Sequence, residues 1–210
     1  MKITSLVHYK GAVFEVVLEE KKKIYLHIDI VTDFHLESGM EIERDQLREI
    51  IYASNFRRAY QYALYCLDRR DYSAEELYEK LEEKYKSEKL CLGVIRKLAK
   101  ADLINDRRYG EKLARKYAEI KKFGYYRCLR EMKQKGVDGD LAEELLTAYE
   151  GQFYENLREL LNGKYSSALT DCTDRKAVER VKNSLVRYGY GFDDINRAVR
   201  EFFEDDAAQG

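Results

Sequence analysis

The chain has 210 residues, and its 38 Lys and Arg nearly balance 39 Asp and Glu, giving a net charge of −1. With 45% hydrophobic residues, no proline and no tryptophan, this composition excludes a disordered or loop-rich protein and favours long helices around a buried core. The four cysteines lack CxxC spacing, which argues against a zinc site or a disulfide framework. No signal peptide and no run of eighteen apolar residues is present, so we expect a cytoplasmic protein without membrane contact.

Residues 1–50 predict a small antiparallel β region. The segment KIYLHIDI alternates apolar with polar side chains, which indicates a strand with one buried face; its apolar residues are Ile24, Leu26, Ile28 and Ile30. The preceding AVFEVVLEE is a second candidate strand, and the polar residues Glu20–Lys23 form the turn between the two.

The same region holds all three histidines, His8, His27 and His35. His27 and Asp29 fall on one strand face and, with His35, could hold a metal ion, but a solvated strand face is the commoner arrangement. None of the motifs GxxxxGK[ST], GxGxxG, HExxH and GxSxG occurs. We therefore expect no catalytic residues, no metal and no cofactor, and a protein that is not an enzyme.

From Phe56 onward the apolar spacing becomes that of α-helices. Phe56, Tyr60, Ala63 and Leu67 predict the buried stripe of a first helix, and similar stripes recur to Phe203. Middle helices begin at Ser73, Gly124 and Thr173, and Ser73 forms a capping box with Glu76. Glycine, which suits the left-handed residue after a helix, ends two of these helices, at Gly136 and Gly189.

A period near fifty residues predicts tandem three-helix units. The expected fold is mainly α, and α+β overall because of the N-terminal sheet. The expected divisions are a β region at 1–50, three-helix repeats at 51–105, 106–150 and 151–206, and a tail at 207–210.

Positive charge is concentrated in the middle of this neutral chain. Between Lys112 and Lys135 only Glu119 and Glu131 oppose nine bases, which are Lys112, Arg115, Lys116, Lys121, Lys122, Arg127, Arg130, Lys133 and Lys135. Helical spacing predicts that six of these bases face solvent, namely Lys112, Arg115, Lys116, Lys122, Arg127 and Arg130. So dense a cluster of like charges favours binding to a polyanion or an acidic protein. A solvated helix surface is the simpler alternative for any single Lys or Arg.

Tyr125 and Tyr126 could stack on nucleic-acid bases, although core or boundary packing is the commoner role of such residues.

Four segments together resemble the RecX family of bacterial regulatory proteins: LDRRDYSAEELYEKLEEK from Leu67, LINDRRYGEKLARKY from Leu103, KKFGYYRCLREMKQKGV from Lys121, and LVRYGYGFDDINRAV from Leu185. The resemblance covers about 150 residues. It implies tandem three-helix repeats forming an elongated curved rod. It also implies a modulator of RecA that lies in the groove of the filament on single-stranded DNA and acts in homologous recombination, DNA repair and the SOS response.

By this resemblance, the protein restrains ATP hydrolysis, strand exchange and coprotease activity of RecA. Filament or DNA contacts are expected at the nine bases, so charge reversal at Arg127 and Arg130 should weaken filament binding. Ser73, Asn105, Asp106, Gly124, Gly136 and Gly189 match structural positions, with Asn105 and Asp106 expected to cap the first helix of the second repeat.

The N-terminal β region and the polar segment Asn162–Thr173 depart from the family pattern. The first could add a partner contact, and the second leaves open how the third repeat packs. We expect a monomer whose partners are the RecA filament and single-stranded DNA. The alternatives are a free-standing, non-specific DNA-binding protein and a helical scaffold for another acidic partner.

Overall fold

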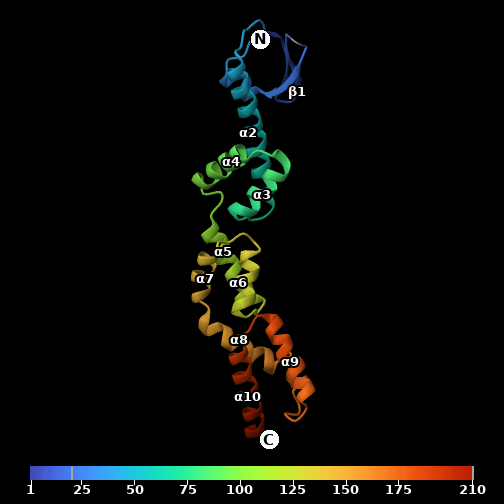
Figure 1. The fold of residues 1–210 in the computed structure, drawn as a ribbon, viewed down its shortest axis with the longest axis vertical. Helices are drawn as coiled ribbons and strands as arrows, with labels where there is room; N and C mark the ends of the chain where they lie inside the picture. Colours follow the sequence, from blue (N-terminus) through green and yellow to red (C-terminus); the bar gives the residue numbers. More distant parts are fainter. Residues whose placement is uncertain (20, 210) are drawn as a thin grey trace. The chain divides into compact units, whose positions relative to one another are not determined.

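The computed structural model describes residues 1–19 and 21–209, and the side chains of residues 1–19 and 21–204. Glu20, in the expected turn, and Gly210, in the expected tail, lie outside the described residues. The fold is mainly helical with a small antiparallel sheet at its start, which confirms the expected class (Figure 1). The chain divides into two compact units. One comprises Met1–Arg70 and Leu77–Leu103, and the other comprises Asp71–Glu76 and the residues from Ile104 onward.

The sheet of the first unit has three antiparallel strands in the order β1-β2-β3, namely Ile3–Lys10, Val13–Leu18 and Lys23–His27. Strand β1 was not among the predicted strands, and Lys23 belongs to β3 and not to the turn. One sheet face packs on the loop and helix that follow, so a small core forms from Ile3, Val16, Leu18, Leu26, Ile30, Leu36, Ile42, Leu47 and Ile50.

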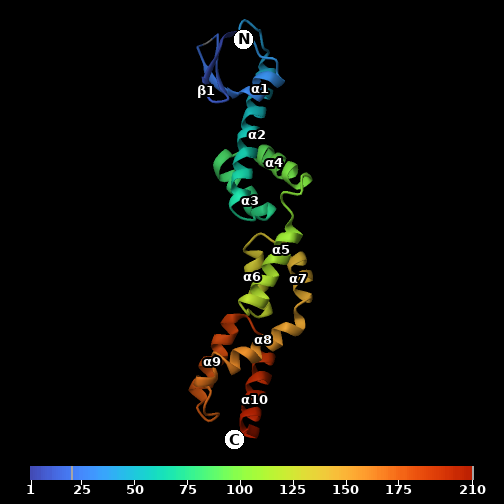
Figure 2. The same ribbon diagram turned by 180° about the vertical axis from the view of Figure 1, so that it is seen from behind.

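The predicted strand over residues 23–30 ends earlier than its alternating pattern indicates. Helix α1, Ile28–Asp33, begins directly after β3, and the His27 ring accepts a hydrogen bond from the backbone N–H of Asp29. Ile30 is buried by this helical turn, whereas Ile28 is exposed. In Figure 2, α1 lies beside the sheet at the start of the next helix, α2.

Helices α2 (Arg44–Arg69), α3 (Ala74–Tyr85) and α4 (Glu88–Lys100) follow in chain order. The predicted stripe of α2 is wrong in part, because Phe56, Tyr60 and Leu67 are only half-buried. The residues that α2 buries are Leu47, Ile50, Ser54, Ala59, Ala63 and Cys66. Small side chains at 59, 63 and 66 allow α4 to pack closely against α2.

The second unit begins with α5 (Asp106–Arg115), which continues as the π-helical segment η1 (Lys116–Ile120), and then α6 (Tyr125–Lys133) and α7 (Gly139–Thr147). Their shared core centres on fully buried Ala118, Cys128, Met132 and Leu146. Gly136 lies in the left-handed region with φ +70°, and the turn after α6 reverses there, as its glycine predicted.

Helices α8 (Glu150–Asn162), α9 (Arg175–Tyr188) and α10 (Phe192–Gln209) follow, with a 3-10 turn, η2, at Ser166–Ala168. Helix α9 begins later than predicted, because Asp174 and not Thr173 caps it, accepting from the N–H groups of Lys176 and Ala177. Gly189 ends α9 with φ +93°, as predicted. Helix α10 continues through residues 207–209, which were expected to form a tail.

The polar segment Asn162–Thr173 is anchored to the third set of helices. Tyr165 and Leu169 are buried in the same core as Leu161 and Leu185. The Tyr165 hydroxyl also lies 2.8 Å from the Ser184 hydroxyl of α9. Sequence polarity therefore understated the packing of this segment, because two apolar side chains suffice to fix it.

The four cysteines differ sharply in their expected reactivity. Cys66, Cys91 and Cys128 are buried, and Cys172 is exposed. Burial raises the pKa of the Cys91 thiol to about 11 and that of Cys128 to about 12, so neither forms a thiolate at pH 8.

We expect one thiol per chain to react rapidly with 5,5′-dithiobis(2-nitrobenzoate) in the native state and four to react in guanidinium. Removal of the rapid phase by Cys172→Ser would identify the thiol, whereas a second rapid equivalent would contradict the assignment.

Candidate functional site

The nine mid-chain bases lie on α5, η1, α6 and the turns that follow them. Six are exposed and three, Lys122, Arg127 and Lys135, are half-buried. The fold supplies acidic partners for seven of them. The pairs are Lys112–Asp71, Arg115–Glu119, Lys122–Glu159, Arg127–Glu131, Arg130–Glu131, Lys133–Glu143 and Lys135–Glu76.

Four of these acids, Asp71, Glu76, Glu143 and Glu159, come from outside the basic segment. The local charge excess in the sequence is therefore partly balanced in the folded chain. Exposed ion pairs of this kind contribute only about 0–1 kcal/mol each, so phosphate groups can compete for the bases. Among the described residues, Lys116 and Lys121 have no acidic partner, and they remain the most available cations of the set.

Arg127 was predicted to face solvent, but its side chain packs against neighbouring groups. Its guanidinium carbon lies 3.8 Å from the centre of the Phe123 ring, and its Nη1 donates to the Arg187 carbonyl at 3.3 Å. Its Nε also donates to Glu131 at 3.3 Å, and the side chain is 29% exposed. Arg127 thus joins α6 to the end of α9. Charge reversal there would disturb packing, and Arg130, whose side chain is 60% exposed, is the better probe of binding.

Gly124 and Gly189 bring α6 and the end of α9 into backbone contact. The N–H of Gly124 donates to the Tyr188 carbonyl at 2.9 Å, and the N–H of Tyr126 donates to the Gly189 carbonyl at 3.1 Å. The Tyr190 hydroxyl donates to the Lys122 carbonyl at 2.7 Å, and burial raises the pKa of that hydroxyl. These contacts position the basic surface of α6 against the third set of helices.

Two of the predicted capping residues act at the start of α3, and the third caps α5. The Ser73 hydroxyl accepts from the N–H of Glu76 at 3.1 Å, as the capping box predicts. Asn105 caps α5 by accepting from the N–H of Arg108 at 3.0 Å. Asp106 acts differently from the prediction, because its Oδ1 accepts from the N–H of Ala74 at 2.8 Å and so caps α3.

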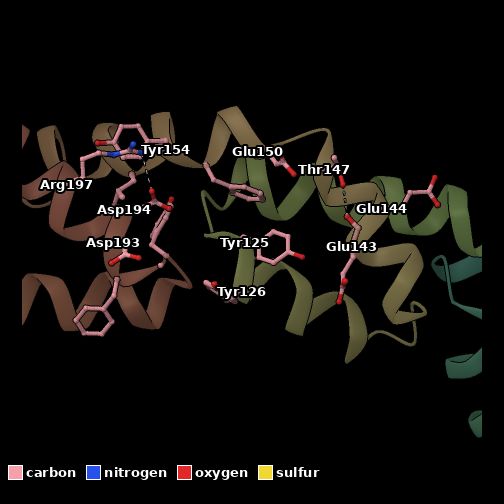
Figure 3. Close-up of a pocket in the computed structure, with 15 residues that line it drawn as sticks. Tyr125, Tyr126, Glu143, Glu144, Thr147, Glu150, Tyr154, Asp193, Asp194 and Arg197 are labelled. Carbon is pink, nitrogen blue, oxygen red and sulfur yellow. Dashed lines mark hydrogen bonds and ion pairs between the residues drawn. The ribbon is translucent and has the colours of Figure 1, made fainter.

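An open cleft of about 730 Å³ separates α6 and α7 from α8 and α10 (Figure 3). Aromatic residues, including Tyr125, Tyr126 and Tyr154, line it together with five carboxylates: Glu143, Glu144, Glu150, Asp193 and Asp194. Arg197 is its one basic lining residue; its guanidinium carbon lies 3.9 Å from the Tyr154 ring centre, and it pairs with Asp194. The carboxylates make this cleft unfavourable for a phosphate backbone.

Tyr125 and Tyr126 occupy different environments. The Tyr125 ring packs edge-on against Phe153, whereas the Tyr126 side chain is 64% exposed. Tyr126 also borders a shallow hollow on α6 with Leu129, Arg130, Lys133 and Gln134. Of the two tyrosines, only Tyr126 has a ring exposed enough to contact a partner.

Asn156 is a structural residue that the sequence analysis missed. It is 2% exposed, and its Nδ2 donates to the Ala118 carbonyl at 2.7 Å, while its Oδ1 accepts from Gln152 at 3.1 Å. The available signal was its position three residues after Phe153 on the apolar stripe of α8. A polar residue at such a position indicates a buried hydrogen bond.

Two of the three suggested metal ligands lie together, because His27 Nδ1 is 3.2 Å from an Asp29 carboxylate oxygen. Asp29 pairs with Arg57 at 2.7 Å, and this guanidinium lowers the pKa of the Asp29 carboxyl. Within the part of the chain that the structure describes, no group of three or more His, Cys, Asp or Glu side chains could hold a metal ion. None of the described helices is both long and apolar enough to cross a lipid bilayer.

The fold and its comparisons define a helical-repeat protein with a small N-terminal sheet. Residues 105–146 match the family model described as RecX, second three-helix domain. Regulatory protein RecX of Bacillus velezensis is 29% identical over 200 residues, covering 93% of this chain and 75% of the relative. Regulatory protein RecX of Clostridium acetobutylicum is 27% identical over 186 residues, covering 87% and 83%.

Solved structures agree with this similarity. A crystal structure of regulatory protein RecX superposes with a TM-score of 0.72 at 19% identity, covering 95% of this chain and 98% of that one. RecX from Lactobacillus salivarius superposes with a TM-score of 0.61 at 28% identity, covering 71% and 97%. Along 87–93% of its length the chain is similar to proteins named regulatory protein RecX, and residues 105–146 carry the match to the RecX family model. These relatives are named as regulators and not as enzymes.

Proposed function

We propose that this protein binds the RecA filament on single-stranded DNA and inhibits its ATP hydrolysis, strand exchange and coprotease activity. The observation that carries the proposal is similarity to proteins named regulatory protein RecX along 87–93% of this chain. The nine mid-chain bases are the proposed contact set, with Lys116, Lys121 and Arg130 as its most accessible members. We further propose a cytoplasmic monomer without catalytic activity.

The test is ATP hydrolysis by RecA of the same organism on single-stranded DNA, with this protein added below stoichiometry. We expect the rate to fall. Lys121→Glu/Arg130→Glu should require about 10-fold more protein for the same inhibition, because losing two cationic contacts removes about 1.4 kcal/mol or more of binding free energy. Both side chains are exposed, so the variant should stay folded.

Arg175→Glu/Lys176→Glu is the matched control, because it makes the same change in net charge at two exposed residues in the first turn of α9. Acidic residues are favourable at that end of a helix. The control should inhibit like the unmodified protein. If both variants inhibit equally, the mid-chain bases do not contribute to inhibition. If the unmodified protein does not inhibit, the proposed function is wrong.

The alternatives predict different results in the same assay. A free-standing DNA-binding protein would slow hydrolysis only by competing for DNA, so preformed filaments with saturating RecA would be unaffected. A scaffold for another acidic protein would neither bind DNA nor alter RecA. The mixed surface of the second unit, in which seven mid-chain bases are paired, gives neither alternative a specific advantage.

A further inference from the structure

The first unit carries a second basic surface, which lies on α4. Lys89, Arg96, Lys97 and Lys100 are all exposed, and none has an acidic partner among the described residues. Their positions at i, i+7, i+8 and i+11 place them on one helical face, beside the face of the buried Leu90, Val94 and Leu98. This contrasts with the mid-chain bases, most of which already have carboxylate partners.

Aromatic rings of α2 lie next to this basic face. Tyr52, Phe56 and Tyr60 recur every four residues, and the Tyr52 and Phe56 ring centres are 6.2 Å apart. Lys97 Nζ lies 4.5 Å from the Tyr60 ring centre and 5.7 Å from that of Phe56, and Lys89 Nζ lies 5.5 Å from that of Tyr52. Cations and ring faces therefore alternate along the surface.

Gly93 of α4 lies directly against these rings. A Cβ atom at this position would lie 3.1 Å from Cε2 of Phe56 and 3.4 Å from the Tyr52 hydroxyl. Glycine thus lets the two rings lie against α4 between the lysines. The rings stay at the surface, with Tyr52 38% exposed, although aromatic residues at helical spacing are typical of a core.

The rings and Lys97 line a groove of about 540 Å³. Ile30 and Asp33 of α1 and the Asp29–Arg57 ion pair line the same groove. Its volume is in the range of small-molecule and nucleotide sites. From Tyr52 to Tyr60 the helix rises by about 12 Å, the length of about three to four nucleotides of one strand at about 3.4 Å each.

We propose that this α2–α4 surface binds single-stranded nucleic acid, with the α4 bases on phosphates and the Tyr52 ring stacked on a base. Cations adjoining ring faces are the combination that single-stranded nucleic acids require. Duplex DNA would not use the rings, because its base faces are already stacked. An acidic protein would use the bases but not the ring faces. The proposal rests on the proposed function for its biological setting and adds a direct DNA contact distinct from the mid-chain bases.

Binding of the full chain to a fluorescein-labelled oligothymidylate of about 20 nucleotides, measured by fluorescence anisotropy without RecA, tests the proposal. Lys97→Glu/Lys100→Glu should weaken binding at least about 10-fold and reduce the slope of log K against log salt by about 1.4, since each phosphate contact contributes about 0.7. Tyr52→Ala should weaken binding about 5-fold or more and leave the slope unchanged, because it removes stacking and not charge.

The matched controls all lie on α2, the helix that carries Tyr52. Tyr52→Phe keeps the ring and should bind normally, as should Tyr65→Ala, which removes a 53% exposed tyrosine that does not line the groove. Arg44→Glu/Arg48→Glu repeats the charge change at two exposed residues near the start of α2. Circular dichroism would confirm that each variant is folded.

Three outcomes would overturn the proposal. The first is unchanged affinity in both Tyr52→Ala and Lys97→Glu/Lys100→Glu. The second is loss of binding only in Lys121→Glu/Arg130→Glu, which would place the DNA contact on the mid-chain bases. The third is that poly-L-glutamate displaces the labelled oligothymidylate as effectively as unlabelled oligothymidylate does, which would favour an acidic protein partner. Failure of RecA inhibition with DNA binding intact would refute the proposed function and leave this site standing.

Discussion

Gly189→Ala should lower the free energy of unfolding by about 3–4 kcal/mol, and so lower the midpoint of thermal unfolding by about 6–15 °C. Gly189 has φ +93°, which strains any residue with a Cβ atom. The added Cβ would also overlap the backbone nitrogen and Cβ of Arg127. Relief would require α6 to separate from the end of α9, with loss of the hydrogen bond from Tyr126 to the Gly189 carbonyl.

Gly124→Ala should have a similar effect, because its Cβ would overlap the Gly189 carbonyl group from the other side of the same contact. Gly151→Ala is the control. Nothing lies within 4 Å of a Cβ there, and alanine in α8 should stabilise by about 0.5–1 kcal/mol. Thermal and urea unfolding followed by circular dichroism at 222 nm would compare the three. An unchanged midpoint for Gly189→Ala would show that the two helices do not meet through their backbones.

Asn156→Asp should destabilise the protein by about 3 kcal/mol at pH 8, because it places a buried carboxylate against the Ala118 carbonyl oxygen in place of a donor. The protonated acid could still donate there, so folding would raise the pKa of the introduced carboxyl. The folded state would then bind more protons than the unfolded state, and stability would fall as pH rises from about 4 through the raised pKa. The deficit relative to the unmodified protein should therefore be smaller at pH 5 than at pH 8.

Asn162→Asp provides the comparison for this pH dependence. Asn162 ends the same helix but is exposed, so the same change of side chain should alter stability by less than about 0.5 kcal/mol at either pH. Urea unfolding at the two pH values measures both variants. A deficit for Asn156→Asp that does not change with pH would argue that lost packing, and not the buried charge, is responsible.

Helix positions in this protein follow from local sequence, and the errors in the predicted strands have local causes as well. Gly189 ends α9 and Ser73 caps α3 as predicted, because both signals depend on a few adjacent residues. Strand β1 was missed because its last four residues are all exposed, so it shows no one-sided apolar pattern. The β3 strand was extended too far because Ile28 and Ile30 keep the alternation although the chain turns into α1 at His27.

The electrostatics of the candidate site could not be predicted in the same way. The partners of Lys112 and Lys122 lie 41 and 37 residues away in the chain, and only the tertiary fold brings Asp71 and Glu159 to them. A count of charges along the sequence therefore overstated the positive surface around α6. It also overlooked α4, whose four bases have no acidic partner among the residues that the structure describes.

The joint between α6 and α9 is made by main-chain atoms at Gly124 and Gly189, and it has a thermodynamic consequence. Side chains at an interface can change rotamer, but two peptide backbones joined by hydrogen bonds have no such freedom. The second and third sets of helices are therefore held together at this joint before any partner arrives. A partner that contacts both sets meets a surface whose ordering entropy was lost during folding, so less of the contact energy is consumed by immobilisation on binding.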